Sequence, residues 1–151
     1  MKIKIQPVLL IVSLFIGANA LAQIKDTIHL VCPFEHGSGR EAKEAFTWDP
    51  PDKRVIMVSL RDTAVRSAVN GKVSNVNPAE DGLFEVVIYT KDYYFWYYGV
   101  TKAFVTRGQT VSAGQTVAYN KLGTELEFRM FKNEDPLDPR ELLDCKVPKA
   151  E

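Results

Sequence analysis

The stretch GTELEFRM, residues 123–130, alternates strictly between polar and apolar side chains. Successive side chains of an extended segment point to opposite faces, so Glu125, Glu127 and Arg129 share one face. The other face carries the apolar residues Leu126, Phe128 and Met130. The apolar face predicts a strand packed on a core. The polar face leaves three alternatives open, which are a metal site, a catalytic carboxylate pair and a solvated or ion-paired surface.

Similar β-rich runs fill the chain from Arg54 onward, separated by turn residues. We expect strands at 54–60, 64–68, 71–76, 83–90, 93–99, 103–106, 116–120 and 124–131. The expected turns lie at Asn70-Gly71, Asp81-Gly82, Lys91-Asp92, Gly108 and Gly114. Asp138, as an N-cap before Pro139, predicts one short C-terminal helix. The pattern therefore predicts an all-β domain, an antiparallel β-sheet or β-sandwich with one short C-terminal helix.

The run YYFWYY at 93–98 is the most aromatic part of the chain. Alternation places Tyr93, Phe95 and Tyr97 on one face and the remaining three rings on the other. We expect one face to lie in the core. The other face is either an exposed aromatic strip, suited to sugar rings or to an apolar groove of a partner, or the covered face of a central strand.

The N-terminal sequence MKIKIQPVLLIVSLFIGANALAQ is typical of a secretory signal peptide. Lys2 and Lys4 precede an apolar run that ends in a small-x-small cleavage site, so we expect cleavage after Ala22. This predicts a secreted protein, periplasmic or extracellular, with no membrane span after cleavage. The remaining chain has 17 basic and 19 acidic residues, a net charge of −2 that favours no nucleic-acid partner.

Cys32 and Cys145 are the two cysteines of the chain. In an oxidising compartment, such a pair favours a disulfide that ties the two ends of the mature chain together. Two unpaired thiols are the alternative. His29 and His36 flank Cys32, but their spacing lacks the CxxC or HxH pairs that are typical of zinc sites.

Three parts of the chain are expected from these patterns. Residues 1–22 form the signal peptide, 23–53 an irregular N-terminal segment with a helix-capable stretch at 39–46, and 54–151 the β domain. No nucleophile elbow, phosphate-binding loop or zincin helix motif is present in the sequence.

From Thr63 to Leu143 the chain resembles the lysostaphin-type (LytM-like) peptidoglycan endopeptidase domain. The resemblance is carried in order by TAVRSAVNGKVSNV, GLFEVVIYTKDYYFWYYGV, FVTRGQTVSAGQTVAYN and ELEFRMFKNEDPLDPRELL. It implies a LytM-like β fold related to the barrel-sandwich hybrids. A lipoyl- or biotinyl-type carrier shares part of this pattern, but export argues against that function.

The family holds zinc with an early His, an Asp four residues later and the second His of an HxH motif. The resemblance places HxH on Glu125 and Glu127, and the histidine of a "YxHL" motif on Gly99, after Tyr97. The early His and Asp fall near residues 52–56, where the chain has no histidine. The resemblance therefore implies that the metal ligands are missing, so we expect no metal and no cofactor. Arg129 favours an ion-paired face.

A binding or regulatory module of the bacterial cell envelope is the function that the resemblance implies, as a pseudoenzyme of this zinc metallopeptidase family. The expected partner is peptidoglycan, a cell-wall amidase or another envelope protein. The expected groove is lined by Tyr97, Gly99, Glu125, Glu127 and Arg129. The alternative function is a cell-wall hydrolase with a rebuilt carboxylate site at Glu125 and Glu127.

Overall fold

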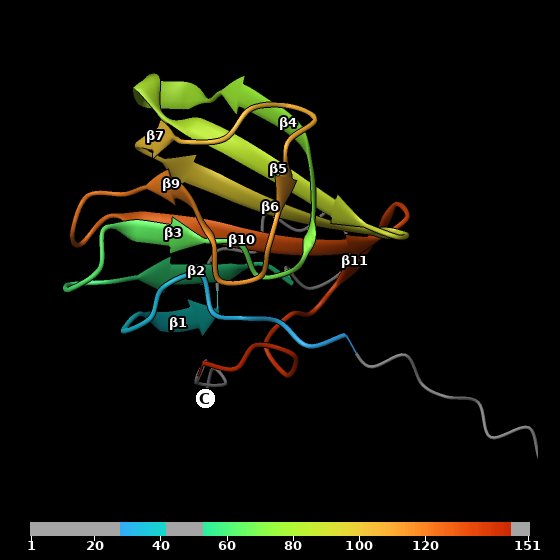
Figure 1. Ribbon diagram of the computed structural model, residues 1–151. Helices are drawn as coiled ribbons and strands as arrows, with labels where there is room; N and C mark the ends of the chain where they lie inside the picture. Colours follow the sequence, from blue (N-terminus) through green and yellow to red (C-terminus); the bar gives the residue numbers. More distant parts are fainter. Residues whose placement is uncertain (1–27, 42–52, 146–151) are drawn as a thin grey trace, which may run out of the picture.

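The computed structural model describes residues 28–41 and 53–145, so the predicted signal peptide lies outside the described residues (Figure 1). Strands make up nearly all of the regular structure. They are β1 (Ser38–Glu41), β2 (Val55–Val58), β3 (Ala64–Arg66), β4 (Gly71–Pro78), β5 (Phe84–Thr90), β6 (Tyr93–Val100), β7 (Lys102–Ala103), β8 (Thr110–Val111), β9 (Thr116–Tyr119), β10 (Glu125–Lys132) and β11 (Asp135–Leu137). One 3-10 turn, η1 (Glu80–Gly82), lies between β4 and β5.

The strands form two antiparallel sheets. The larger sheet has the order β1-β2-β10-β6-β5-β4-β8, and β11 pairs with the last residues of β10. The smaller sheet has the order β3-β9-β7. At the centre of the larger sheet, β10 lies between β2 and β6, with Phe128 opposite both Val55 and Tyr97. This register places the apolar residues of three neighbouring strands on one face.

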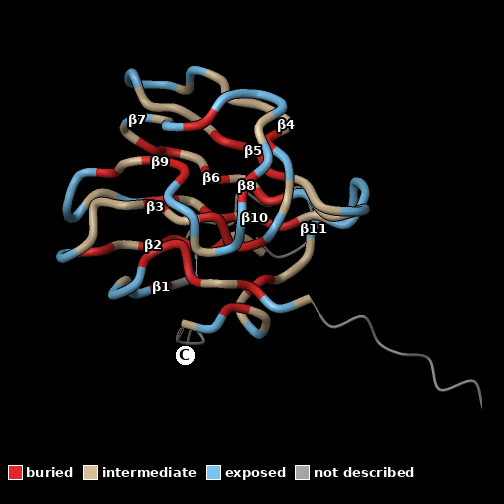
Figure 2. The backbone as a smooth tube through the Cα atoms, in the orientation of Figure 1, coloured by how far each residue is buried: buried red, intermediate tan, exposed pale blue. Residues whose placement is uncertain are grey.

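The core lies between the inner face of the larger sheet and the smaller sheet (Figure 2). Leu126, Phe128 and Met130 of β10 are at most 1% exposed, and Val65 and Val117 of the smaller sheet are fully buried in the same cluster. The Phe128 ring packs against that of Tyr97, with centroids 5.2 Å apart. Burial of such side chains stabilises the fold by about 1.5–3 kcal/mol each.

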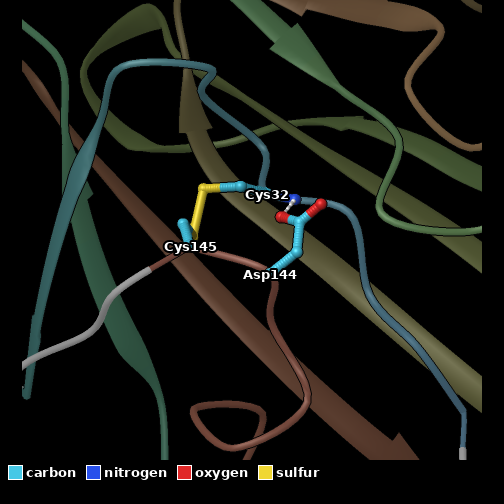
Figure 3. Close-up of side chains that lie close together, drawn as sticks. All are labelled: Cys32, Asp144 and Cys145. Carbon is cyan, nitrogen blue, oxygen red and sulfur yellow. Dashed lines mark hydrogen bonds between the residues drawn. A yellow bond between two sulfur atoms is a disulfide. The ribbon is translucent and has the colours of Figure 1, made fainter.

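The two ends of the described chain lie together and are joined covalently (Figure 3). Cys32 and Cys145 form the predicted disulfide, with Cα atoms 5.4 Å apart. The Cys32 N–H also donates to the Asp144 carboxylate at 2.6 Å, and Leu30 forms a parallel bridge with Leu143. In the chain-entropy model, closing a loop of this length stabilises the fold by about 5 kcal/mol.

The all-β prediction is confirmed, but the short C-terminal helix is wrong: the described residues contain no α-helix. Asp138 does cap a turn, since it accepts the Arg140 N–H at 3.0 Å. The next residues do not continue it, because Leu143 and Cys145 are held against the N-terminal segment by the bridge and the disulfide. A tertiary restraint therefore overrides the local helix signal.

The segment at 23–53 contains an unexpected strand. Ser38–Glu41 forms β1 and pairs with β2, although we expected helix-forming potential at 39–46; residues 42–52 lie outside the described chain. Strands β8 and β11 were also missed, because runs of two or three residues leave no periodic signal. Among the described residues, no helix has the length and apolar character needed to span a membrane.

Candidate functional site

The outer face of β10 carries Glu127 between two arginines. Arg54 Nη1 donates to Glu127 Oε2 at 2.8 Å, and the Arg129 guanidinium binds Oε1. The Glu127 side chain is only 14% exposed, whereas those of Arg54 and Arg129 are 23% and 40% exposed. Both carboxylate oxygens are therefore engaged by cations. Of the three alternatives for this polar face, the structure shows the ion-paired one at Glu127.

The strand next to these glutamates is apolar at the facing positions. Ile56 of β2 lies opposite Glu127 and is 7% exposed, and Val58 lies opposite Glu125. Within residues 28–41 and 53–145, one group of three potential ligands has its atoms within 4.8 Å of one another, which is Cys32, Asp144 and Cys145. Among the residues that the structure describes, Glu125 and Glu127 belong to no such group. The residues described at this position do not fit a zinc ion, because Glu127 is held by guanidinium groups and its β2 neighbour offers no ligand atom.

Gly99 ends the aromatic run of β6 next to the first glutamate. Its φ is +89°, and an added Cβ would lie 3.3 Å from the Glu125 carbonyl oxygen. A residue with a side chain adopts this backbone conformation only at a cost. The position that the resemblance matched to a family histidine is therefore shaped for glycine.

Tyr97 is fully buried on the inner face of the sheet, not on the face of Glu127 and Arg129. Its hydroxyl accepts the Ala68 N–H at 2.7 Å. Burial raises the pKa of this hydroxyl well above its usual value, so it stays protonated. Tyr97 is therefore part of the core. The expectation that it lines the groove is wrong, because its side chain is fully buried.

Both histidines of the chain, His29 and His36, precede β1. The His36 N–H donates to Asp62 Oδ2 at 2.5 Å, and His36 Nδ1 lies 3.1 Å from Asp62 Oδ1. Burial opposes the charge on Asp62, but the hydrogen bonds from His36 outweigh it and lower the pKa of this carboxyl. His29 lines a separate cavity of about 240 Å³ with Ile28, Val69 and Tyr93. Neither histidine is placed with Glu125 and Glu127 in a ligand cluster among the described residues.

The aromatic run divides between the two faces of the sheet as its alternation predicts. Phe95 is fully buried, whereas Tyr94 is 38% exposed, and Trp96 and Tyr98 are half-buried on the outer face. Tyr98 lies directly opposite Glu127, and Trp96 opposite Arg129. The outer face therefore presents an aromatic strip beside the ion-paired residues.

Arg54 is the residue of this site that the sequence interpretation missed. It precedes β2 by one residue, and alternation from Ile56 would have placed it on the outer face. The sequence alone therefore predicts the face on which Arg54 lies. Its partner on β10 is 73 residues away, however, so the contact follows only from the strand order.

Comparison with known proteins places this architecture in a family. The model of peptidase family M23 matches residues 53–139, more than half of the chain. The chain therefore belongs to peptidase family M23. This agrees with the lysostaphin-type resemblance of its strands and turns. An M23 domain with a disulfide indicates an extracytoplasmic protein of the cell envelope.

Solved structures share the fold at low sequence identity. A chain of the SpoIIQ–SpoIIIAH pore-forming complex is 14% identical, with a TM-score of 0.60 over 80% of this chain and 94% of that chain. Csd3 of Helicobacter pylori is 18% identical, with a TM-score of 0.62 over 82% of this chain and 35% of that chain. The catalytic domain of the antimicrobial peptidase lysostaphin from Staphylococcus simulans is 21% identical, with a TM-score of 0.53 over 67% and 85%. The sequence has no significant match among curated proteins.

Proposed function

We propose that this protein is a non-catalytic M23 domain that serves as a binding or regulatory module in the bacterial cell envelope, in the periplasm or outside the cell. The observation that carries the proposal is the state of Glu127, whose two carboxylate oxygens are held by Arg54 and Arg129. By the resemblance, this is the position of a zinc-ligating histidine. Two guanidinium groups there repel a divalent cation instead of helping to bind it.

Two neighbouring positions support the same proposal. A hydrolytic zinc site needs three protein ligands and an open position for water. Ile56, which lies within the segment expected to hold the early His and Asp, is apolar and opposite Glu127. Gly99 has a backbone conformation that disfavours any side chain at the position of a catalytic histidine.

A rebuilt carboxylate hydrolase is less well supported. Such an enzyme needs one carboxyl group as a general acid and a second one free to act as base or nucleophile. Glu127 is engaged at both oxygens, so it is poorly placed for either role. We therefore keep the binding function as the proposal.

The ligand of this module is peptidoglycan or an envelope protein that acts on it. Peptidoglycan is the material that a peptidase of this family would approach, and the strip of Tyr94, Trp96 and Tyr98 provides contact area on the outer face. A protein partner is the second candidate, because a chain of similar fold occurs in the SpoIIQ–SpoIIIAH pore-forming complex.

The test uses the exported chain, residues 23–151 as predicted. Zinc content is measured after incubation with zinc and desalting, release of fragments from purified sacculi is followed by chromatography, and sacculus binding is measured by co-sedimentation. We expect no stoichiometric zinc, no released fragments, and binding that Arg129→Ala weakens and Arg107→Ala, a change of an exposed arginine in the β7–β8 loop, does not. One zinc per chain together with fragment release would overturn the proposal.

A further inference from the structure

The outer face carries a second feature beyond the ion-paired glutamate. The β5–β6 and β10–β11 hairpins turn at the same end of the larger sheet (Figure 1). Residues of the two hairpins line a shallow depression of about 720 Å³. Its floor consists of Tyr94, Trp96 and Phe131. Its rim consists of the turn residues Lys91, Asp92, Asn133 and Glu134.

The floor is an aromatic surface supported by three strands. Tyr94 lies opposite Tyr89 on one side and Phe131 on the other. The Tyr89 and Tyr94 rings are stacked with centroids 6.1 Å apart, and those of Trp96 and Phe131 lie 5.6 Å apart. Paired strands beneath these rings limit their freedom, so they lose little entropy when a ligand packs on them.

The rim is held in place by contacts between the two turns. The Asn133 N–H donates to the Asp92 carbonyl at 2.7 Å, and Lys132 Nζ lies 3.6 Å from the Asp92 carboxylate. Lys91 and Asn133 both adopt left-handed backbone conformations, with φ of 54° and 53°, which close the turns tightly. The depression is therefore formed before a ligand arrives.

The chemistry of the depression selects a class of ligand. The face of an aromatic ring is the negative side of its quadrupole. It attracts the polarised C–H groups on the apolar face of a pyranose ring. The carboxylates, amide and ammonium of the rim can accept and donate hydrogen bonds to hydroxyl and acetamido groups. Of the charged rim residues, Lys91 is basic and Asp92 and Glu134 are acidic, so the rim has no excess of positive charge for a polyanion.

A protein partner fits this surface less well. A stable protein interface covers about 800 Å² on each partner and has a continuous apolar centre. Here charged and amide groups surround an aromatic floor of three rings. A floor of this size matches one or two sugar rings.

We propose that this depression binds the N-acetylated glycan strand of peptidoglycan, with sugar rings stacked on Tyr94 and Trp96. The inference rests on the proposed function, because it names the glycan as the part of peptidoglycan that the module recognises. The stem peptides remain free to contact the ion-paired end of the same face.

Chitohexaose, an uncharged oligomer of N-acetylglucosamine, is the probe for this site. In a Trp48→Phe background, Trp96 is the only tryptophan of the chain, so its fluorescence reports on the depression. We expect a saturable fluorescence change on titration, little dependence on salt, and competition by chitohexaose against sacculus binding. Tyr94→Ala should weaken binding about tenfold through loss of one stacking partner.

Phe104→Ala is the matched control, because Phe104 is 53% exposed and does not line the depression. It should leave chitohexaose affinity unchanged, and circular dichroism should show that both variants are folded. Chitohexaose binding that survives Tyr94→Ala, or no chitohexaose binding while the protein still sediments with sacculi, overturns the glycan site and leaves the proposed function standing. If the protein cleaves sacculi in a zinc-dependent way and still binds chitohexaose through Tyr94, the glycan site is supported and the proposed non-catalytic function is overturned.

Discussion

The two faces of strand β10 differ in chemistry, although they belong to the same eight residues. On the inner face, Leu126, Phe128 and Met130 are buried in a core shared with β2, β6 and the smaller sheet. On the outer face, Glu127 is enclosed by Arg54 and Arg129, beside an aromatic strip. Side chains on opposite faces of a strand do not contact each other. An M23 fold can therefore persist on the inner face while the chemistry of the outer face changes.

A core substitution should give the largest effect. Phe128→Ala removes a fully buried ring that packs against Phe95 and Tyr97, so we expect the free energy of unfolding to fall by about 3–5 kcal/mol. Urea denaturation with the disulfide intact measures this. A loss below about 1 kcal/mol, as is usual for surface substitutions, would show that the inner face does not carry the fold.

Removal of the disulfide should follow closely. The Cys32→Ser, Cys145→Ser double variant frees a loop that spans 113 residues, and loss of such a bond typically costs about 2–5 kcal/mol. Thermal unfolding of the variant and of the reduced wild type should agree, because both open the same loop. A change confined to only one of the two would indicate that the substitutions, not the lost bond, cause it.

Gly99→Ala tests why a glycine is needed next to Glu125. The φ of +89° and the nearby Glu125 carbonyl predict a loss of about 1–3 kcal/mol in stability. Gly108→Ala is the matched control, because Gly108 has a φ of +87° but no atom within 4 Å of an added Cβ. The first variant should be the less stable one. Equal losses would mean that backbone strain alone, without the contact to Glu125, sets the need for glycine.

Glu127→Gln should have a smaller effect on stability than these substitutions. It removes the charge that holds Arg54 and Arg129, and we expect a loss of about 1 kcal/mol, limited by solvent screening. Glu80→Ala, at an exposed residue of the 3-10 turn, is the control for loss of one acidic charge. A loss no larger than that of Glu80→Ala would show that the ion pairs of Glu127 with Arg54 and Arg129 do not contribute to stability.

The smallest expected effect concerns pH. Hydrogen bonds from His36 lower the pKa of Asp62 in the folded protein, so the ionised carboxylate stabilises the fold above the pKa of the unfolded chain. This contribution disappears as the pH falls through the lower, folded-state pKa, in the range below about pH 4. Asp62→Asn should therefore reduce stability at pH 7 and flatten its dependence on acid. A variant that keeps the full acid dependence would exclude Asp62 as its source.

Much of the fold follows from local patterns in the chain. Alternation in 123–130 and 93–98 predicted β10 and β6, and it separated their core residues from their outer residues. Three features were not predictable in this way. Strand β1 depends on an edge of β2 that accepts it, the C-terminal segment is tied to Leu30 by a bridge and to Cys32 by the disulfide, and the strands β8 and β11 are too short to be periodic.

Only some residues of the outer site could be predicted from the sequence. Glu127, Arg129 and the aromatic strip were expected on one face, whereas Arg54 and Phe131 joined the site through strand order and hairpin geometry. Tyr97, by contrast, was expected in the outer site but does not belong to it. Its motif pointed to a groove, but an odd position of β6 shared with Phe95 places it in the core.

Local patterns in the chain are enough to predict the all-β class, the apolar face of each long strand and the two glutamates where the resemblance implies zinc ligands. These properties depend on neighbours within a few residues, which periodicity and motif spacing describe. Two other features appear only in the folded chain: Glu127 is paired with an arginine 73 residues away, and two distant hairpins enclose an aromatic depression. Both depend on which strands pair, and strand pairing is set by the energy of the whole core and not by any single segment.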